Sequence, residues 1–322
     1  MIRGHRYSAG FSLIELMTAM LLSLLLMGAS ISLFIGNKRV YASTEGMGRI
    51  QENARIAFEL MSRDIREAGG NPCDVRMKVV NVLDDTTNWW ATFGTGTDTG
   101  VFGYDEGSFT GSTAGTDAIQ IQYFEDTGLV TSGSMGSDTG NLPIEDIDAI
   151  EEQQILMACG FFPTSGAVPV TDTAAIFSAG KSGSEITHDT DAGNARTNFS
   201  STAYPTAVVF PANTLIGSLR AMEWYVAAND KGRNSLFRRQ VRFTGAAPEL
   251  GDAEEVVEDV LGLELTYLEG NTWTTALPSS WNNVKAVQVE LDLEAAENRA
   301  GGVEGEMIKR KLTHVIALRN RL

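Results

Sequence analysis

No ionisable side chain interrupts the chain between Leu16 and Gly36. At about 1.5 Å per helical residue, this run is long enough to cross the roughly 30 Å hydrocarbon core of a membrane. An acidic residue, Glu15, stands directly before it. A carboxylate costs about 2.5–3.5 kcal/mol at mid-bilayer and less near the end of a helix. We therefore expect a membrane-spanning helix whose acid has a specific partner.

The segment before this run carries Arg3 and Arg6, no acid, and small residues at its end, Ala9-Gly10. A secretory signal places its small-residue cleavage site after the apolar region, where cleavage removes that region. Here the small residues come first. Cleavage between Gly10 and Phe11 leaves the apolar helix on the mature chain, with Phe11 as its new amino terminus.

The junction Gly10-Phe11-Ser12-Leu13-Ile14-Glu15 resembles the class III signal of type IV prepilins. The resemblance implies that residues 1–10 are a leader, that prepilin peptidase cleaves after Gly10, and that Phe11 becomes N-methylated. It also implies that Glu15 faces the terminal amine of a neighbouring subunit. In lipid, a carboxylate and an ammonium cost less together than apart. The alternative is an ordinary membrane anchor with a stray acid.

Residues 37–68 continue the helix of residues 11–36 as an amphipathic segment. Their apolar side chains recur at helical spacing, with charged residues on the other faces. Gly69-Gly70-Asn71-Pro72 predicts the end of the helix. The glycines at 36, 46 and 48 leave open whether the helix is kinked. The apolar positions are Ile50, Ala54, Ala57, Phe58, Met61 and Ile65.

Charge does not decide the orientation, because Arg3 and Arg6 precede the apolar run and Lys38 and Arg39 follow it. The prepilin resemblance implies a single-pass inner-membrane protein with its head in the periplasm, which later joins an extracellular filament. In an exported head, the two cysteines, Cys73 and Cys159, predict one disulfide. Closing such a long loop stabilises a fold by about 4–5 kcal/mol in the chain-entropy model.

The chain is acidic, with a formal net charge of −16. Residues 69–200 form an acidic region rich in Gly, Ser and Thr, in which residues 118–124 and 155–162 are predicted strands between exposed loops. This charge disfavours nucleic acid as a partner, because phosphates are repelled.

Residues 201–322 predict an antiparallel sheet. Residues 219–227 and 235–243 flank a hairpin turn, and 256–260 is a candidate short helix. Further strands are expected at 261–267, 287–293 and 311–318. The predicted fold class is α+β: the long helix packs on this sheet in the lollipop shape of pilins.

Residues 51–66, Cys73, residues 235–238 and the closing Leu318-Arg-Asn-Arg-Leu322 are similar to the PilW family of type IV pilus minor pilins. The resemblance is thin over residues 85–150. It implies a minor pilin that initiates assembly at or near the filament tip. Its implied partners are other minor pilins, the major pilin and a tip adhesin. Two alternatives stay open: a J-type pseudopilin of type II secretion, and a pilin-borne adhesin that binds through its acidic loops.

Motifs for catalysis or cofactors are weak, and we predict no enzyme activity and no cofactor. Ala179-Gly-Lys-Ser182 lacks the first glycine of a phosphate-binding loop. Asp189 and Asp191 are weak calcium candidates, because Gly193 stands where the third oxygen ligand belongs and Ser200 where the final glutamate belongs. A solvated acidic surface is the simpler interpretation. The histidines, His5, His188 and His314, do not form a metal-binding pattern.

Overall fold

A computed structural model describes residues 10–73, 77–85, 87–94, 100–160, 173–199, 208–295 and 307–321. Residues 1–9 of the expected leader, residues 1–10, lie outside them. The chain divides into two compact units. One contains residues up to 51 together with 294–309, and the other, here called the head unit, contains residues 52–293 and 310–322. Each is described by itself.

The long helix α1 runs without interruption from Leu13 to Glu67. The glycines at 36, 46 and 48 are all helical, so the expected single helix is confirmed and the kink is not observed. The helix ends where the sequence predicts. Gly70 donates its amide to the Glu67 carbonyl at 2.8 Å, and Gly69 adopts a φ of 71°, a left-handed conformation that glycine adopts without strain.

Within the head unit, one face of α1 is buried against the sheet. The predicted apolar positions Ala54, Ala57, Met61 and Ile65 are all buried. Asp64 is buried on the same side, at 3% exposure, and accepts a hydrogen bond from Trp224 Nε1 at 3.0 Å. The amphipathic pattern therefore identifies the packed face.

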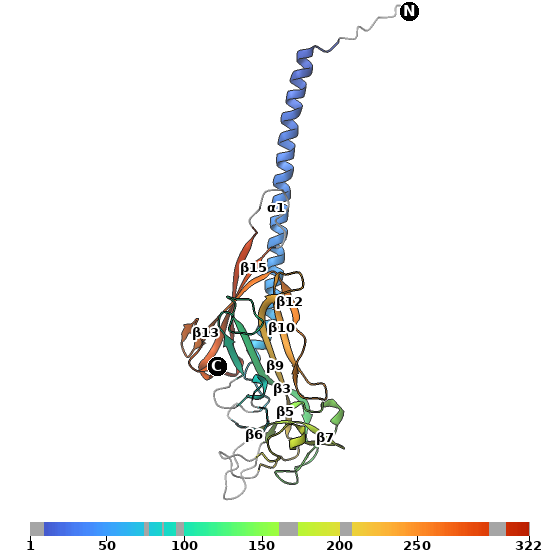
Figure 1. The fold of residues 1–322 in the computed structure, drawn as a ribbon, viewed down its shortest axis with the longest axis vertical. Helices are drawn as coiled ribbons and strands as arrows, with labels where there is room; N and C mark the ends of the chain where they lie inside the picture. The colour runs from blue at the N-terminus through green and yellow to red at the C-terminus, as the bar shows by residue number, and fades with distance from the viewer. Residues whose placement is uncertain are drawn as a thin grey trace, which may run out of the picture. The chain divides into compact units, whose positions relative to one another are not determined.

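The main sheet has nine strands, and β9 (Leu215–Ala228) is at its centre. β9 pairs antiparallel with β3 (Ala118–Val130) along one edge, and with β5 (Ile155–Gly160) and then β10 (Asn234–Arg242) along the other. β3, β9 and β10 run side by side in Figure 1. The remaining strands are β1 (Lys78–Asn81), β2 (Val101–Tyr104), β6 (Thr173–Ser178), β11 (Glu249–Leu250) and β12 (Glu254–Glu258).

A second sheet has the order β14-β13-β15-β16, and a third the order β4-β8-β7. β13 (Val260–Glu269) and β15 (Val284–Glu294) pair antiparallel, with the alternating burial that the sequence predicts. The other strands are β14 (Thr272–Thr274), β16 (Lys309–Ala317), β4 (Leu142–Pro143), β7 (Gly180–Ser182) and β8 (Glu185–Thr187). Short 3₁₀ helices span Trp89–Ala91, Ile147–Ala149, Thr190–Ala192, Trp281–Asn283 and Arg319–Arg321.

The α+β prediction of one long helix and a largely antiparallel sheet is confirmed, with two corrections. β1 and β6 pair in parallel, so the main sheet is mixed. Glu254–Glu258 is strand β12 rather than part of a helix at 256–260, because it pairs with β10 and so gains ladder hydrogen bonds. Local sequence does not reveal either long-range pairing.

Sequential aromatic contacts connect the main and second sheets inside the head unit. Ring centroids lie 5.1–6.0 Å apart along this series, so aromatic packing fills the junction. In order of contact the residues are Phe237, Tyr225, Phe109, Tyr104, Phe102, Trp281 and Tyr267.

Cys73 and Cys159 form a disulfide, with Cα atoms 5.3 Å apart and 86 positions of separation. It ties the segment after α1 to β5, inside a buried cluster that also contains Met157 and Ile176. The expected pairing is confirmed in the structure.

Candidate functional site: the start of the long helix

The first turn of α1 is closed by a reciprocal pair of hydrogen bonds between Ser12 and Glu15. The Ser12 amide donates to Glu15 Oε2 at 3.0 Å, and the Glu15 amide donates to Ser12 Oγ at 3.2 Å. This is a capping box, with Ser12 as the N-cap residue and Glu15 three positions later. Glu15 therefore satisfies a helix-end amide and lies where the helix dipole favours negative charge.

Apolar side chains surround the rest of this helical segment and are exposed. Phe11 is 87% exposed, and every residue from Gly10 to Val40 is exposed. By length and composition, α1 is the one helix among the described residues that is apolar enough to cross a membrane. An apolar surface of this extent is typical of contact with lipid or with other apolar protein surfaces.

The hydroxyl groups of this segment bond within the helix. Thr18, Ser23 and Ser30 donate to the carbonyls of Glu15, Ala19 and Leu26 at 3.0, 2.7 and 2.8 Å. In lipid, an unsatisfied hydroxyl is costly, and bonding to the preceding turn removes that cost. Glu15 is then the one ionisable group in the described part of the apolar segment.

Gly10, Phe11 and Glu15 thus lie together at the start of the helix, as expected. Our sequence reasoning missed the role of Ser12. A Ser-x-x-Glu pattern just before an apolar run is a local signal for a capping box and was available in the sequence.

Of the two calcium candidates, Asp189 has a structural role. The Asp189 carboxylate accepts the Ala192 amide at 3.0 Å and caps a 3₁₀ helix, while Asp191 is exposed. Among the described residues, His, Cys, Asp and Glu side chains do not gather in groups of three that could hold a metal. Ser200, the expected last position of that loop, lies outside the described residues.

The structure describes two histidines, His188 and His314, and neither belongs to a cluster that could hold a metal ion. His188 is 3% exposed, packs on Phe199 with ring centroids 4.3 Å apart, and lies 2.8 Å from the Gly140 carbonyl through Nε2. Since a carbonyl only accepts, Nε2 carries the proton. Burial lowers the pKa of the His188 imidazole below its ordinary value, despite this hydrogen bond. His314 is exposed on β16 beside Phe58, with ring centroids 5.4 Å apart.

The Gly- and Ser-rich segment 131–142 is packed rather than extended from the head. Met135 and Leu142 belong to a buried cluster, and the Met135 amide donates to the Phe210 carbonyl at 2.9 Å. The residues between these two are exposed or half-buried, as expected for a loop, but the loop is fixed to the core at both positions. Apolar residues at wide spacing anchor the polar residues between them.

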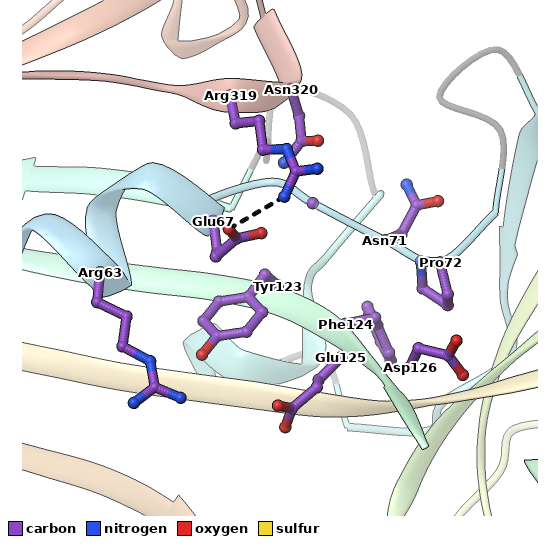
Figure 2. Close-up of a pocket in the computed structure, with 11 residues that line it drawn as sticks. Arg63, Glu67, Asn71, Pro72, Tyr123, Phe124, Glu125, Asp126, Arg319 and Asn320 are labelled. Atoms are coloured by element: carbon purple, nitrogen blue, oxygen red, sulfur yellow. Dashed lines mark ion pairs between the residues drawn. The ribbon is translucent and has the colours of Figure 1, made fainter. Parts of the chain in front are cut away.

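A polar groove of about 540 Å³ lies at the end of α1 in the head unit. Figure 2 shows Arg319 paired with Glu67 across it, at 3.6 Å, while Arg63 points away from that pair. Asn71 and Asn320 also line it. The lining is a mixture of acids, arginines and amides, without a nucleophile held against a base, so its geometry does not point to catalysis.

Comparison with known protein families gives one match, at the start of the chain. Residues 5–31 match the family model described as the prokaryotic N-terminal methylation motif. The chain carries a prepilin-type methylation motif. This match covers the junction at Gly10 and Phe11 and the first part of α1.

Among solved structures, the type IV-like pilin TTHA1219 from Thermus thermophilus is similar, at 9% sequence identity and a TM-score of 0.36. The similarity covers 85% of this chain and 99% of that one. A TM-score this low does not establish a shared fold. No curated protein sequence matches the chain.

Proposed function

We propose that this chain is a structural minor pilin of a type IV pilus, cleaved after Gly10 and N-methylated on Phe11. The observation that carries the proposal is the methylation motif at residues 5–31, which runs directly into an exposed apolar helix with Glu15 in its first turn. Before assembly the helix anchors the chain in the inner membrane, with the head in the periplasm. Afterwards it lies among the helices of the filament.

Glu15 is proposed as the contact that sets the register between subunits. Its carboxylate accepts one hydrogen bond from the Ser12 amide, and a carboxylate has room for further donors. Cleavage creates an ammonium group on Phe11, and a neighbouring subunit can bring that group to Glu15. In the low dielectric of the helix bundle, the two charges stabilise each other strongly.

The test is Glu15→Ala in the full chain expressed in its own cells. We expect normal cleavage, because the cleavage point lies before Glu15, and loss of the subunit from sheared filaments. Immunoblots of membrane and filament fractions measure both. Glu45→Ala is the matched control, since Glu45 lies on the same helix and pairs only with Arg49 among the described residues. Normal amounts of the Glu15→Ala subunit in filaments would refute the role of Glu15.

The finer assignment rests on the PilW resemblance: assembly initiation at or near the tip, with other minor pilins, the major pilin and a tip adhesin as partners. A type II secretion pseudopilin would use the same first turn, so the Glu15 test does not separate the two. The neighbouring genes do. Companion prepilins with a large adhesin favour the pilus, and secretion-system genes favour the pseudopilus.

A further inference from the structure

Strand β16 forms one edge of the second sheet, whose order is β14-β13-β15-β16. With nine residues it is the longest edge strand among the described residues, whereas β14 at the opposite edge has three. An edge strand leaves backbone donors and acceptors without partners, so it can pair with a strand of another chain. The register of β16 on β15 determines which of its backbone groups face outward.

Alternate residues of β16 turn their backbone groups away from β15. The Leu318 amide, just after the end of β16, donates to the carbonyl of Lys285, at the start of β15, at 2.9 Å. The two strands are therefore antiparallel, and the even-numbered residues of β16 bond to β15. The backbone groups of Thr313, Val315 and Ala317 face the open edge, where none has a backbone partner among the described residues.

The side chains of the same three residues lie on the outer face of the sheet. Val315 is 52% exposed, whereas Ile316, on the opposite face, is 1% exposed. The register brings Thr313 opposite Glu290, and Thr313 Oγ1 lies 3.4 Å from Glu290 Oε2. Thr313 and Ala317 are exposed as well. An added strand would therefore find both free backbone groups and uncharged side chains along residues 313–317.

An apolar row crosses the outer face of the second sheet and ends at this edge. Trp273 of β14 pairs with Leu268 of β13, and Leu268 pairs with Ala286 of β15. The hydrogen bond at the end of β16 places Ala317 beside Ala286. Trp273 remains 43% exposed. Because cross-strand partners lie on one face of a sheet, a further strand beside β16 would extend this row.

Charged side chains protect other parts of these sheet edges. β12, at an edge of the main sheet, has three glutamates among the five residues Glu254–Glu258. The start of β16 carries Arg310 and Lys311. Charges on an edge disfavour pairing with another strand. Residues 312–317 contain no Lys, Arg, Asp or Glu, so this part of β16 lacks that protection.

We propose that residues 313–317 of β16 receive an extended segment of a different, neighbouring subunit, which adds to the second sheet as a fifth strand. The segment is uncharged where it faces Val315 and Ala317, because a charged side chain there would lose water without gaining a partner. A second copy of this chain is disfavoured, since each copy carries a net charge of −16 and the two repel. The inference rests on the proposed function only in naming the partner as a subunit.

The test is photocross-linking of the full chain in its own cells. The photoreactive residue p-benzoylphenylalanine replaces Thr313, and mass spectrometry identifies the adduct in the membrane fraction. We expect a covalent adduct with an extended segment of one other subunit. The same residue placed at Glu254, an exposed position on β12, should give no such adduct. Since the readout does not require entry into filaments, this test and the Glu15 test can fail independently.

Two variants at Val315 separate strand addition from a nonspecific contact. Val315→Pro removes an outward-facing amide and leaves the ladder with β15 intact, because proline is tolerated at a sheet edge. Val315→Thr keeps the amide and is the matched control. We expect the proline variant to lose the adduct and the threonine variant to keep it, with equal thermal stability. If proline unfolds the head, Val315→Lys places a charge on the edge instead and should also lose the adduct.

Hydrogen exchange measures the backbone contact directly. In the chain alone in detergent, the amides of Val315 and Ala317 should exchange rapidly, and those of His314 and Ile316, bonded to β15, slowly. In the purified adduct all four should exchange slowly. The proposal is overturned if Val315 and Ala317 stay rapid in the adduct, if the proline and threonine variants cross-link alike, if position 254 cross-links equally, or if no adduct forms. An adduct of two copies of this chain also overturns it.

Discussion

The buried carboxylate of Asp64 couples the head half of α1 to the main sheet. Arg238 Nη2 donates to Asp64 Oδ1 at 3.2 Å, and Trp224 Nε1 donates to Oδ2 at 3.0 Å. Burial raises the pKa of the Asp64 carboxyl, and the attraction of Arg238 only partly opposes this. Asp64 therefore satisfies one buried donor and one partly buried donor, and it balances the charge of Arg238.

Asp64→Ala should lower the free energy of unfolding by about 3–5 kcal/mol, because it leaves Arg238 unpaired inside the head. Asp64→Asn should cost less, about 1–3 kcal/mol, since the amide still accepts one bond. Thermal unfolding of the full chain in detergent, followed by near-ultraviolet circular dichroism, measures both. Glu125→Ala breaks the exposed pair with Arg220 and should cost under about 1 kcal/mol. Equal losses for Asp64→Ala and Glu125→Ala would contradict this account.

His188 predicts a pH dependence of stability. Because burial lowers the pKa of this imidazole, the folded chain binds a proton less readily than the unfolded chain. Above the ordinary value of about 6.5, both states are neutral and the effect vanishes. As the pH falls below that value, the unfolded state gains protons first and the free energy of unfolding decreases.

The measurement is chemical unfolding from about pH 7.5 down to about pH 5.5, a range in which an ordinary histidine titrates. His188→Gln should flatten this slope, whereas His314→Gln, at an exposed position, should keep it. An unchanged slope in His188→Gln would assign the pH dependence to other groups.

At the scale of elements, strand β2 packs on the second sheet through Gly103. A β-carbon built at Gly103 would overlap the hydroxyl of Tyr267 and lie 3.1 Å from Trp281 Cη2. Tyr267 is fully buried, so it has little room to move. The position requires glycine for close approach and not for backbone conformation, since its φ is not positive.

Gly103→Ala should therefore destabilise the head by about 1–3 kcal/mol through overpacking. Gly136→Ala is the matched control, because nothing lies within 4 Å of a β-carbon there and its φ is not positive. Thermal unfolding compares the two variants. A stable Gly103→Ala chain would mean that the aromatic junction can rearrange.

Periodicity identified most elements correctly and failed where long-range pairing decided the outcome. The helix of α1, the β9–β10 hairpin and the alternating strand β15 have clear local patterns. β12 does not, because its mixed sequence becomes a strand only beside β10. The capping box of Ser12 and Glu15 is also a local pattern, and our prediction did not include it.

At the scale of the whole molecule, the acidic region is part of the folded head. Segment 131–142 contributes Met135 and Leu142 to a buried cluster, so its removal would open a cavity. Deleting it, as a test for an adhesin, would confuse lost folding with lost binding. Charge changes on the surface avoid this problem.

Deleting residues 131–142 should lower the free energy of unfolding by more than about 3 kcal/mol. By contrast, Glu145→Gln, Asp146→Asn and Asp148→Asn together should change it by less than about 0.5 kcal/mol, because all three side chains are exposed. Thermal unfolding measures both variants. The triple variant then tests the adhesin alternative: loss of target binding by intact pili would support it. A fully stable deletion variant would show that the segment does not support the core.

The sequence by itself determined the kind of object: an apolar helix preceded by a prepilin-type junction, an amphipathic continuation, and two cysteines. These features follow from local periodicity and composition, which can be read from a short segment without knowing what it packs against. Only the tertiary structure decided that β1 pairs in parallel with β6 and that β9 joins strands from both sides of residue 200. Those outcomes depend on contacts between residues far apart in the chain. Tertiary packing decides which strands become neighbours and in which direction they run.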